Sequence, residues 1–160
     1  MAVQATIDEA IKCAREEDFL RALNLFLDIY GTDEAPPIRT PKDASGLSYF
    51  GLALALMRKQ MKPAIDLCRR AISLEFYNGD HYANLARVYA LAGNRKKAVD
   101  AAEQGLKLVP EHDYLLQVRK SLGVRSAPPL PFLDRSNPIN VTLGQSRHAK
   151  KISETEKKKR

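Results

Sequence analysis

The sequence predicts an all-α protein made of three helix hairpins and a final capping helix, followed by an extended basic tail. Two observations lead to this prediction. The stretches YFGLALALMRKQMKPAIDLCRRAISLEF, which begins at Tyr49, and YANLARVYALAGNRKKAVDAAEQGLKLVP, residues 82–110, share nearly the same order of apolar, small and turn residues. In each, apolar residues recur every three or four positions, the spacing that places side chains on one face of a helix.

The composition allows a packed core and limits the function. The chain has 160 residues, 44% of them hydrophobic and 28% charged, which suits one domain. Cys13 and Cys68 each lie in an apolar helical pattern without a partner at metal-ligand spacing, so we expect no disulfide and a reducing compartment. No signal-peptide pattern opens the chain and no run of about 18 apolar residues occurs. We therefore expect a cytoplasmic protein without a membrane span.

The first hairpin, residues 3–30, is the weakest copy. Glu9 stands where the other hairpins have leucine, which an end unit with one exposed face tolerates. Its matching residues, in chain order, are Thr6, Glu9, Ala10, Cys13, Ala22, Phe26 and Ile29. Three prolines and clustered turn residues then predict an inserted loop at residues 31–45.

The second and third hairpins, residues 46–78 and 79–112, carry the repeat most clearly. Gly93 and Asn94 end the first helix of the third hairpin, and Pro110 ends the second. The second hairpin aligns through Tyr49, Leu52, Ala53, Leu56, Ala64, Cys68 and Ala71 with Tyr82, Leu85, Ala86, Tyr89, Ala98, Ala102 and Gly105 of the third. A last helix at 113–123 offers apolar residues to cover the open end of the third hairpin, namely Leu115, Leu116, Val118 and Leu122.

This order of residues resembles the tetratricopeptide repeat (TPR) family, in which an aromatic, a leucine with a small residue, a tyrosine, an alanine and a proline recur in units of about 34 residues. The resemblance covers residues 3–123 and departs from the family at Ala102, where an aromatic is usual. It implies a right-handed superhelical solenoid of three TPR hairpins with a capping helix. A generic helical bundle is the alternative.

The resemblance also implies a binding groove for a peptide, a helix or a protein surface, lined by the first helix of each hairpin. The groove residues on this alignment are Ile7, Ile11 and Ala14, then Phe50, Leu54, Met57 and Arg58, then Asp80, Asn84, Arg87 and Leu91. The apolar members predict a partner with hydrophobic anchors, whose polar backbone or carboxylate groups would be held by Asn84 and Arg87. Alternatively, Phe50, Leu54 and Met57 are ordinary core residues.

Two narrower functions are disfavoured by the sequence. Similar chaperone adaptors hold C-terminal carboxylates with Lys, Asn and Arg, but the corresponding positions here are Ile7, Ile11, Gly51, Asp80 and Asn84, of which only the last is compatible. Catalysis has no HExxH, phosphate-binding loop or CxxC motif behind it. His81, His112 and His148 are too far apart along the chain to converge with a cysteine. We expect no enzyme, no cofactor and no metal.

The tail holds most of the positive charge. Residues 1–123 contain 17 Lys and Arg against 16 Asp and Glu, a net charge of +1, whereas residues 124–160 contain 9 against 3, a net of +6. In the extended segment 124–146 we expect Leu130, Phe132 and Leu133 to dock on the hairpins of the same or a neighbouring chain. Residues 147–160 are interpreted as a solvated, flexible run that could attract nucleic acid without sequence selectivity.

The sequence therefore predicts a non-enzymatic scaffold or adaptor that binds another protein in its groove. Two alternatives stay open: a self-assembling structural protein strapped together by residues 124–146, and a nucleic-acid-associated factor that uses the basic tail.

Overall fold

The computed structural model describes residues 6–31, 41–123, 138–139, 142–143 and 146. Seven numbered helices and no strand occur among these residues, which confirms the all-α prediction for the described part of the chain. The helices are α1 (Ile7–Arg15), α2 (Phe19–Tyr30), α3 (Pro41–Met57), α4 (Met61–Leu74), α5 (Gly79–Leu91), α6 (Arg95–Leu108) and α7 (Asp113–Ser121). The chain divides into two compact units, Met1–Val124 and Arg125–Arg160, and all seven helices belong to the first.

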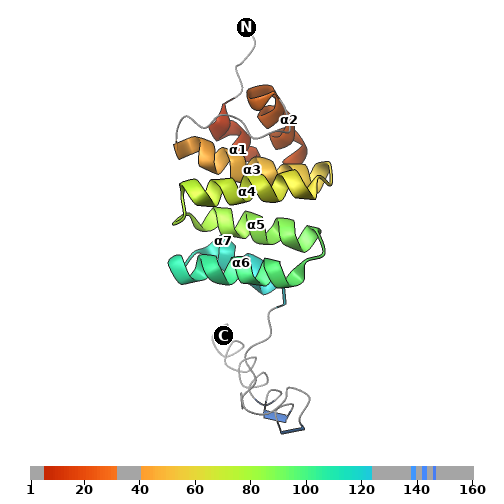
Figure 1. Cartoon of the computed structure of the whole chain (residues 1–160), viewed down its shortest axis with the longest axis vertical. Coiled ribbons are helices and arrows are strands. Elements are labelled where there is room, and N and C mark those ends of the chain that lie inside the picture. The colour runs from red at the N-terminus through yellow and green to blue at the C-terminus, as the bar shows by residue number, and fades with distance from the viewer. Residues whose placement is uncertain (1–5, 32–40, 124–137, 140–141, 144–145, 147–160) are drawn as a thin grey trace, which may run out of the picture. The chain divides into compact units, whose positions relative to one another are not determined.

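The helices of the first unit stack in chain order (Figure 1). Each odd-numbered helix contacts the next odd-numbered helix, so that α1, α3, α5 and α7 form a continuous layer. The helices α2, α4 and α6 each pack on the two odd-numbered helices that flank them in the chain, and do not contact one another. Contacts therefore run between neighbours in sequence, and any site spanning α1 to α7 must be built by long side chains.

Three helix-to-helix turns, at residues 16–18, 58–60 and 92–94, have the same geometry. Each has three residues, and its middle residue lies in the left-handed region, with φ of 64° at Glu17, 57° at Lys59 and 74° at Gly93. A residue that caps the following helix comes next, and in two of the turns its side chain accepts a backbone N–H: Asp18 from Arg21, and Asn94 from Lys97.

The turns fix the register between the second and third hairpins and correct the sequence alignment. Lys59 and Gly93 are 34 residues apart, so the residue of α3 equivalent to Tyr82 is Ser48, and not Tyr49 as predicted. A shift of one residue rotates a side chain by about 100° around a helix. Matching the aromatic residues had therefore turned α3 by about a quarter of its circumference.

The predicted loop at 31–45 is wrong at its C-terminal end, because α3 begins at Pro41. Proline is tolerated in the first turn of a helix, where its missing N–H has no helical acceptor to lose. Asp43 then supplies a negative charge to the first turn, which favours helix initiation.

An aromatic cluster joins the first two hairpins. The ring of Phe50 lies 5.6 Å from that of Phe26 and 5.5 Å from that of Tyr30. Burial raises the pKa of Tyr30 to about 12, with a smaller contribution from Asp43. Glu9, the exceptional residue of α1, forms an ion pair of 3.0 Å with Arg21 in α2.

The third hairpin and α7 approach closely because one residue lacks a side chain. A Cβ atom on Gly105 would lie 2.6 Å from Tyr82 Cβ and 2.6 Å from Leu115 Cδ2. The helix α7 matches the predicted final helix, with Leu115 and Val118 buried. Its C-terminal end is held by Arg95, whose Nη2 donates to the carbonyl oxygens of Leu122 and Gly123, both at 2.8 Å.

The described residues of the second unit are helical at 138–139, 142–143 and 146, so the expectation of an extended segment fails for them. Thr142 Oγ1 donates to the carbonyl oxygen of Pro138 at 2.6 Å, and Ser146 Oγ donates to that of Thr142 at 3.0 Å. Across the described residues of both units, no helix has the length and apolar character that crossing a membrane requires.

Candidate functional site

A pocket of about 270 Å³ lies where α1, α3, α5 and α7 meet. We call it the polar pocket, and its lining residues are Ala14, Arg15, Glu17, Tyr49, Asp80, Arg87 and Tyr114. Four of the seven carry a formal charge and two more are tyrosines. The layer of odd-numbered helices therefore offers a polar surface at this point.

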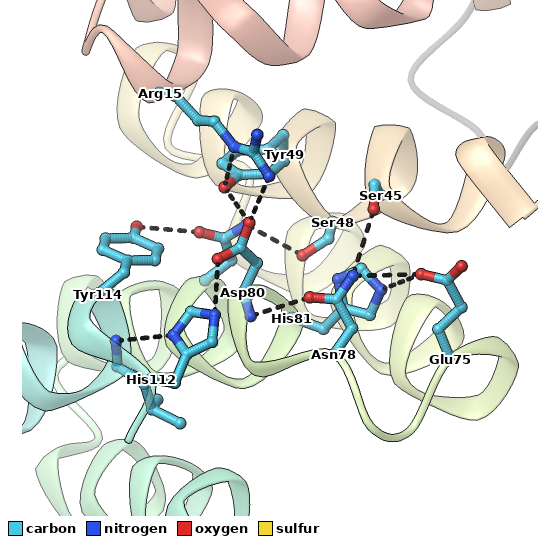
Figure 2. Close-up of polar contacts among 12 residues, drawn as sticks. Arg15, Ser45, Ser48, Tyr49, Glu75, Asn78, Asp80, His81, His112 and Tyr114 are labelled. Carbon is cyan, nitrogen blue, oxygen red and sulfur yellow. Dashed lines mark hydrogen bonds and ion pairs between the residues drawn. The ribbon is translucent and has the colours of Figure 1, made fainter. Parts of the chain in front are cut away.

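Asp80 is the centre of the first hydrogen-bond network in the pocket (Figure 2). Tyr49 donates its hydroxyl to Asp80 Oδ2 at 2.6 Å, and Arg15 Nη2 donates to the same oxygen at 2.9 Å. Arg15 Nε also donates to the Tyr49 hydroxyl at 3.1 Å. Burial, reinforced by the bond to Asp80, raises the pKa of Tyr49, while bonds to Tyr49 and Asp80 raise the pKa of Arg15. The phenol therefore stays neutral and the guanidinium stays charged.

His112 completes the shell of Asp80 from the start of α7. Its Nδ1 accepts the backbone N–H of Leu115 at 3.3 Å, so a neutral ring carries its proton on Nε2. Nε2 lies 3.3 Å from Asp80 Oδ1, where that proton is donated. The Asp80 carboxylate thus receives three donors, from α1, α3 and the residue that caps α7.

A second network runs from the core to the rim of the pocket. Asn84, which has no exposed surface, donates Nδ2 to Ser48 Oγ at 3.0 Å and accepts the Tyr114 hydroxyl at Oδ1, also at 3.0 Å. Arg87 Nη1 donates in turn to the Tyr114 oxygen at 2.9 Å. Burial raises the pKa of Tyr114. Every polar atom along this path has a partner, as a buried network requires.

Three predicted site residues meet here. Asp80, Asn84 and Arg87 are spaced four and three residues apart, so they share one face of α5. The structure brings Asp80 and Arg87 to the pocket lining and places Asn84 beneath it. Ala14, also expected in the groove, lines the pocket.

The apolar strip expected in the groove is absent from this face. Phe50 and Leu54 have no exposed surface and belong to the core, and Ile11 is only 8% exposed. Ile7 is half-buried against the core. Met57, Arg58 and Leu91 are exposed but lie at or beyond the C-terminal ends of α3 and α5, away from the pocket lining. The register error in α3 explains Phe50 and Leu54, because the residue that faces the pocket is Tyr49.

Sequence reasoning missed Arg15, Glu17, Tyr49 and Tyr114. The signal for two of them was present: matching the turns places Tyr49 on the pocket side of α3, and Tyr114 lies 34 residues after Asp80. The predicted docking residues Leu130, Phe132 and Leu133 lie outside the described residues, as does the basic run at 147–160.

A second cavity of about 570 Å³ opens at the connection between α4 and α5. Phe76 and Tyr77 line it and are 50% and 66% exposed. Beside it, His81 is fully buried, with Nε2 3.1 Å from Glu75 Oε2 and Nδ1 lacking a partner among the described residues. Desolvation lowers the pKa of His81, although Glu75 opposes the shift.

The sequence matches no protein-family model, and a search of curated proteins found no match. The function is therefore inferred from the geometry of this chain alone.

Proposed function

We propose that the protein is a non-enzymatic interaction module of the TPR type, a cytoplasmic scaffold or adaptor that binds an extended segment of a partner protein in the polar pocket. The observation that carries this proposal is the pocket itself, in which side chains from four helices converge and are held by hydrogen bonds to one another. A pre-organised concave site with a few fixed polar groups is the usual form of a binding site.

The TPR assignment is supported by the repeated turn. The left-handed residue, the capping residue and the buried alanine recur after 34 residues, as Lys59, Gln60 and Ala64 and then as Gly93, Asn94 and Ala98. Repeats of this length with this pattern characterise the family. The continuous layer of α1, α3, α5 and α7 is the surface on which such proteins bind.

The chemistry of the pocket favours binding over catalysis. The Asp80 carboxylate already receives three donors, which leaves it poorly suited to accept a proton from a substrate. The phenols of Tyr49 and Tyr114 have raised pKa values and their hydrogens are committed to Asp80 and Asn84. Cys68 is buried, and its pKa is raised to about 12, so its thiolate is not available as a nucleophile.

Selection from a library of random peptides, with the full chain as bait, tests this proposal. Ala14→Leu enlarges a side chain that lines the polar pocket, and Ala92→Leu makes the same change at an exposed turn position. We expect selected peptides to lose about tenfold or more in affinity for the Ala14 variant and to bind the Ala92 variant normally. Peptides insensitive to Ala14→Leu, or the absence of any selected peptide, would refute it.

A further inference from the structure

The charges of the polar pocket are balanced only because Glu17 takes part. Arg15 and Arg87 carry two positive charges, and Asp80 and Glu17 carry two negative ones. Asp80 is committed to Arg15 and its other donors, so the charge of Arg87 depends on Glu17. Without Glu17, the pocket lining would have a net charge of +1.

The contact between Arg87 and Glu17 is loose. Arg87 Nη2 lies 3.8 Å from Glu17 Oε1, beyond hydrogen-bond distance, and the Glu17 side chain is 75% exposed. The Arg87 side chain is only 26% exposed, because its guanidinium lies over the Phe19 ring, 5.3 Å from the centroid, and donates Nη1 to Tyr114. One edge of the guanidinium is thus fixed, while the other edge faces an easily displaced carboxylate.

We propose that the polar pocket selects a carboxylate of the partner peptide, which binds Arg87, and that Glu17 holds the place of this carboxylate in the free protein. The proposal rests on the proposed function, since it names the group that the same site recognises. Glu17 then acts as a competitor within the chain.

The neighbours of Glu17 show that its position is particular. Glu16 forms an ion pair of 3.9 Å with Lys12 on the same helix, and Asp18 caps α2 through the N–H of Arg21. Of these three consecutive acidic residues, only Glu17 lines the pocket.

An anion is the ligand that the unused atoms favour. The acceptors of the inner pocket are occupied, since Asp80 and the two tyrosine oxygens already accept hydrogen bonds. The spare donors are guanidinium N–H groups, which bind a carboxylate in a planar fork. When an incoming carboxylate displaces Glu17, the pocket regains neutrality, whereas a lysine or arginine of a partner would add to the positive charge.

The test uses the full chain labelled with ¹⁵N and three blocked tripeptides as probes. The first has glutamate at its centre, the second has glutamine there, and the third has glutamine with a free C-terminal carboxylate. The Arg87 Nε–H resonance reports binding. We expect the first or third probe to shift it and the second to leave it unchanged, and the two carboxylate probes show whether a side chain or a chain end is preferred.

Charge variants test the competitor directly. Glu17→Gln should tighten the dissociation constant of the carboxylate probe by about two- to fivefold, the value of an exposed ion pair. Glu16→Gln is the matched control, with the same charge change one residue away, and should leave it unchanged. Both residues are exposed, so neither variant threatens the fold.

Three results would overturn the inference: equal binding of the glutamine probe, no shift with either carboxylate probe at tens of millimolar, or an affinity that Glu17→Gln leaves equal or weaker. If library peptides still bind in a manner sensitive to Ala14→Leu, the interaction function stands and only the carboxylate is excluded.

Discussion

Replacing Asp80 with alanine should test whether the first network of the polar pocket holds α1, α3, α5 and α7 together. Asp80 is 9% exposed and lies in the first turn of α5, where it receives Tyr49, Arg15 and His112. The substitution removes all three bonds and leaves the hydroxyl of Tyr49, itself 3% exposed, without an acceptor.

The expected cost follows from these contacts. The Tyr49 bond, made to a charged acceptor at 2.6 Å, contributes about 1.5–3 kcal/mol. The Arg15 ion pair contributes about 0–1 kcal/mol, since the Arg15 side chain is 61% exposed and screened by solvent. The longer His112 bond, at 3.3 Å, contributes about 0.5–1 kcal/mol. The relief of burying one carboxylate less offsets part of the total, so we expect Asp80→Ala to lower the free energy of unfolding by about 3 kcal/mol.

Urea unfolding of the full chain, followed by circular dichroism, measures this cost. Asp100→Ala is the control, because Asp100 is exposed on α6 and should change stability by less than about 0.5 kcal/mol. Adding Tyr49→Phe completes a double-mutant cycle with an expected coupling of about 1.5 kcal/mol. A cost below about 1 kcal/mol, or a coupling near zero, would show that this network contributes little to stability and that the packing alone orders the helices.

Three further substitutions test other parts of the fold by the same unfolding assay. Gly105→Ala should cost about 1–3 kcal/mol because the added methyl group meets α5 and α7 at 2.6 Å, and a cost near zero would mean that the two helices readjust freely. Gly93→Ala should cost about 1 kcal/mol and Lys59→Gly should gain a few tenths to about 1 kcal/mol, since both positions have positive φ; equal effects of the same sign would contradict the shared turn geometry. The lowered pKa of His81 means that the unfolded chain binds its proton more readily than the folded one, so stability should be full above pH 6.5 and fall as the pH drops below it, by up to about 1.4 kcal/mol per pH unit. His81→Leu should flatten the stability profile below pH 6.5, and an unchanged slope there would assign the acid sensitivity to other groups.

The sequence predicted most of the helices because their pattern is local. Periodic apolar residues, the Gly93–Asn94 turn and the final helix at 113–123 were recognisable from a few neighbouring residues each, and α5, α6 and α7 match them. The start of α3 was missed because Pro41 was taken as a loop residue, although proline is equally compatible with the first turn of a helix.

The pocket was only partly predictable because its contacts are distant in sequence. Arg15 and Asp80 are 65 residues apart, and the two helices that carry them share no direct packing. Periodicity placed Asp80 and Arg87 on the correct face of α5, since that helix had been aligned through its own turn. It failed for α3, where an aromatic residue was available at two adjacent positions, and Phe50 was chosen for the groove in place of Tyr49.

The polar pocket also explains why the face chosen for binding is stable without a ligand. An apolar groove on the odd-numbered helices would expose surface that favours aggregation. Here Tyr49 and Tyr114 present ring edges and hydroxyls whose bonds to Asp80 and Asn84 are complete in the free protein. The one weak contact is between Arg87 and Glu17, so the site can open for a partner at that point while the two networks beneath it stay intact. Stability and binding therefore depend on different bonds, and substitutions at Asp80 and Glu17 should separate them.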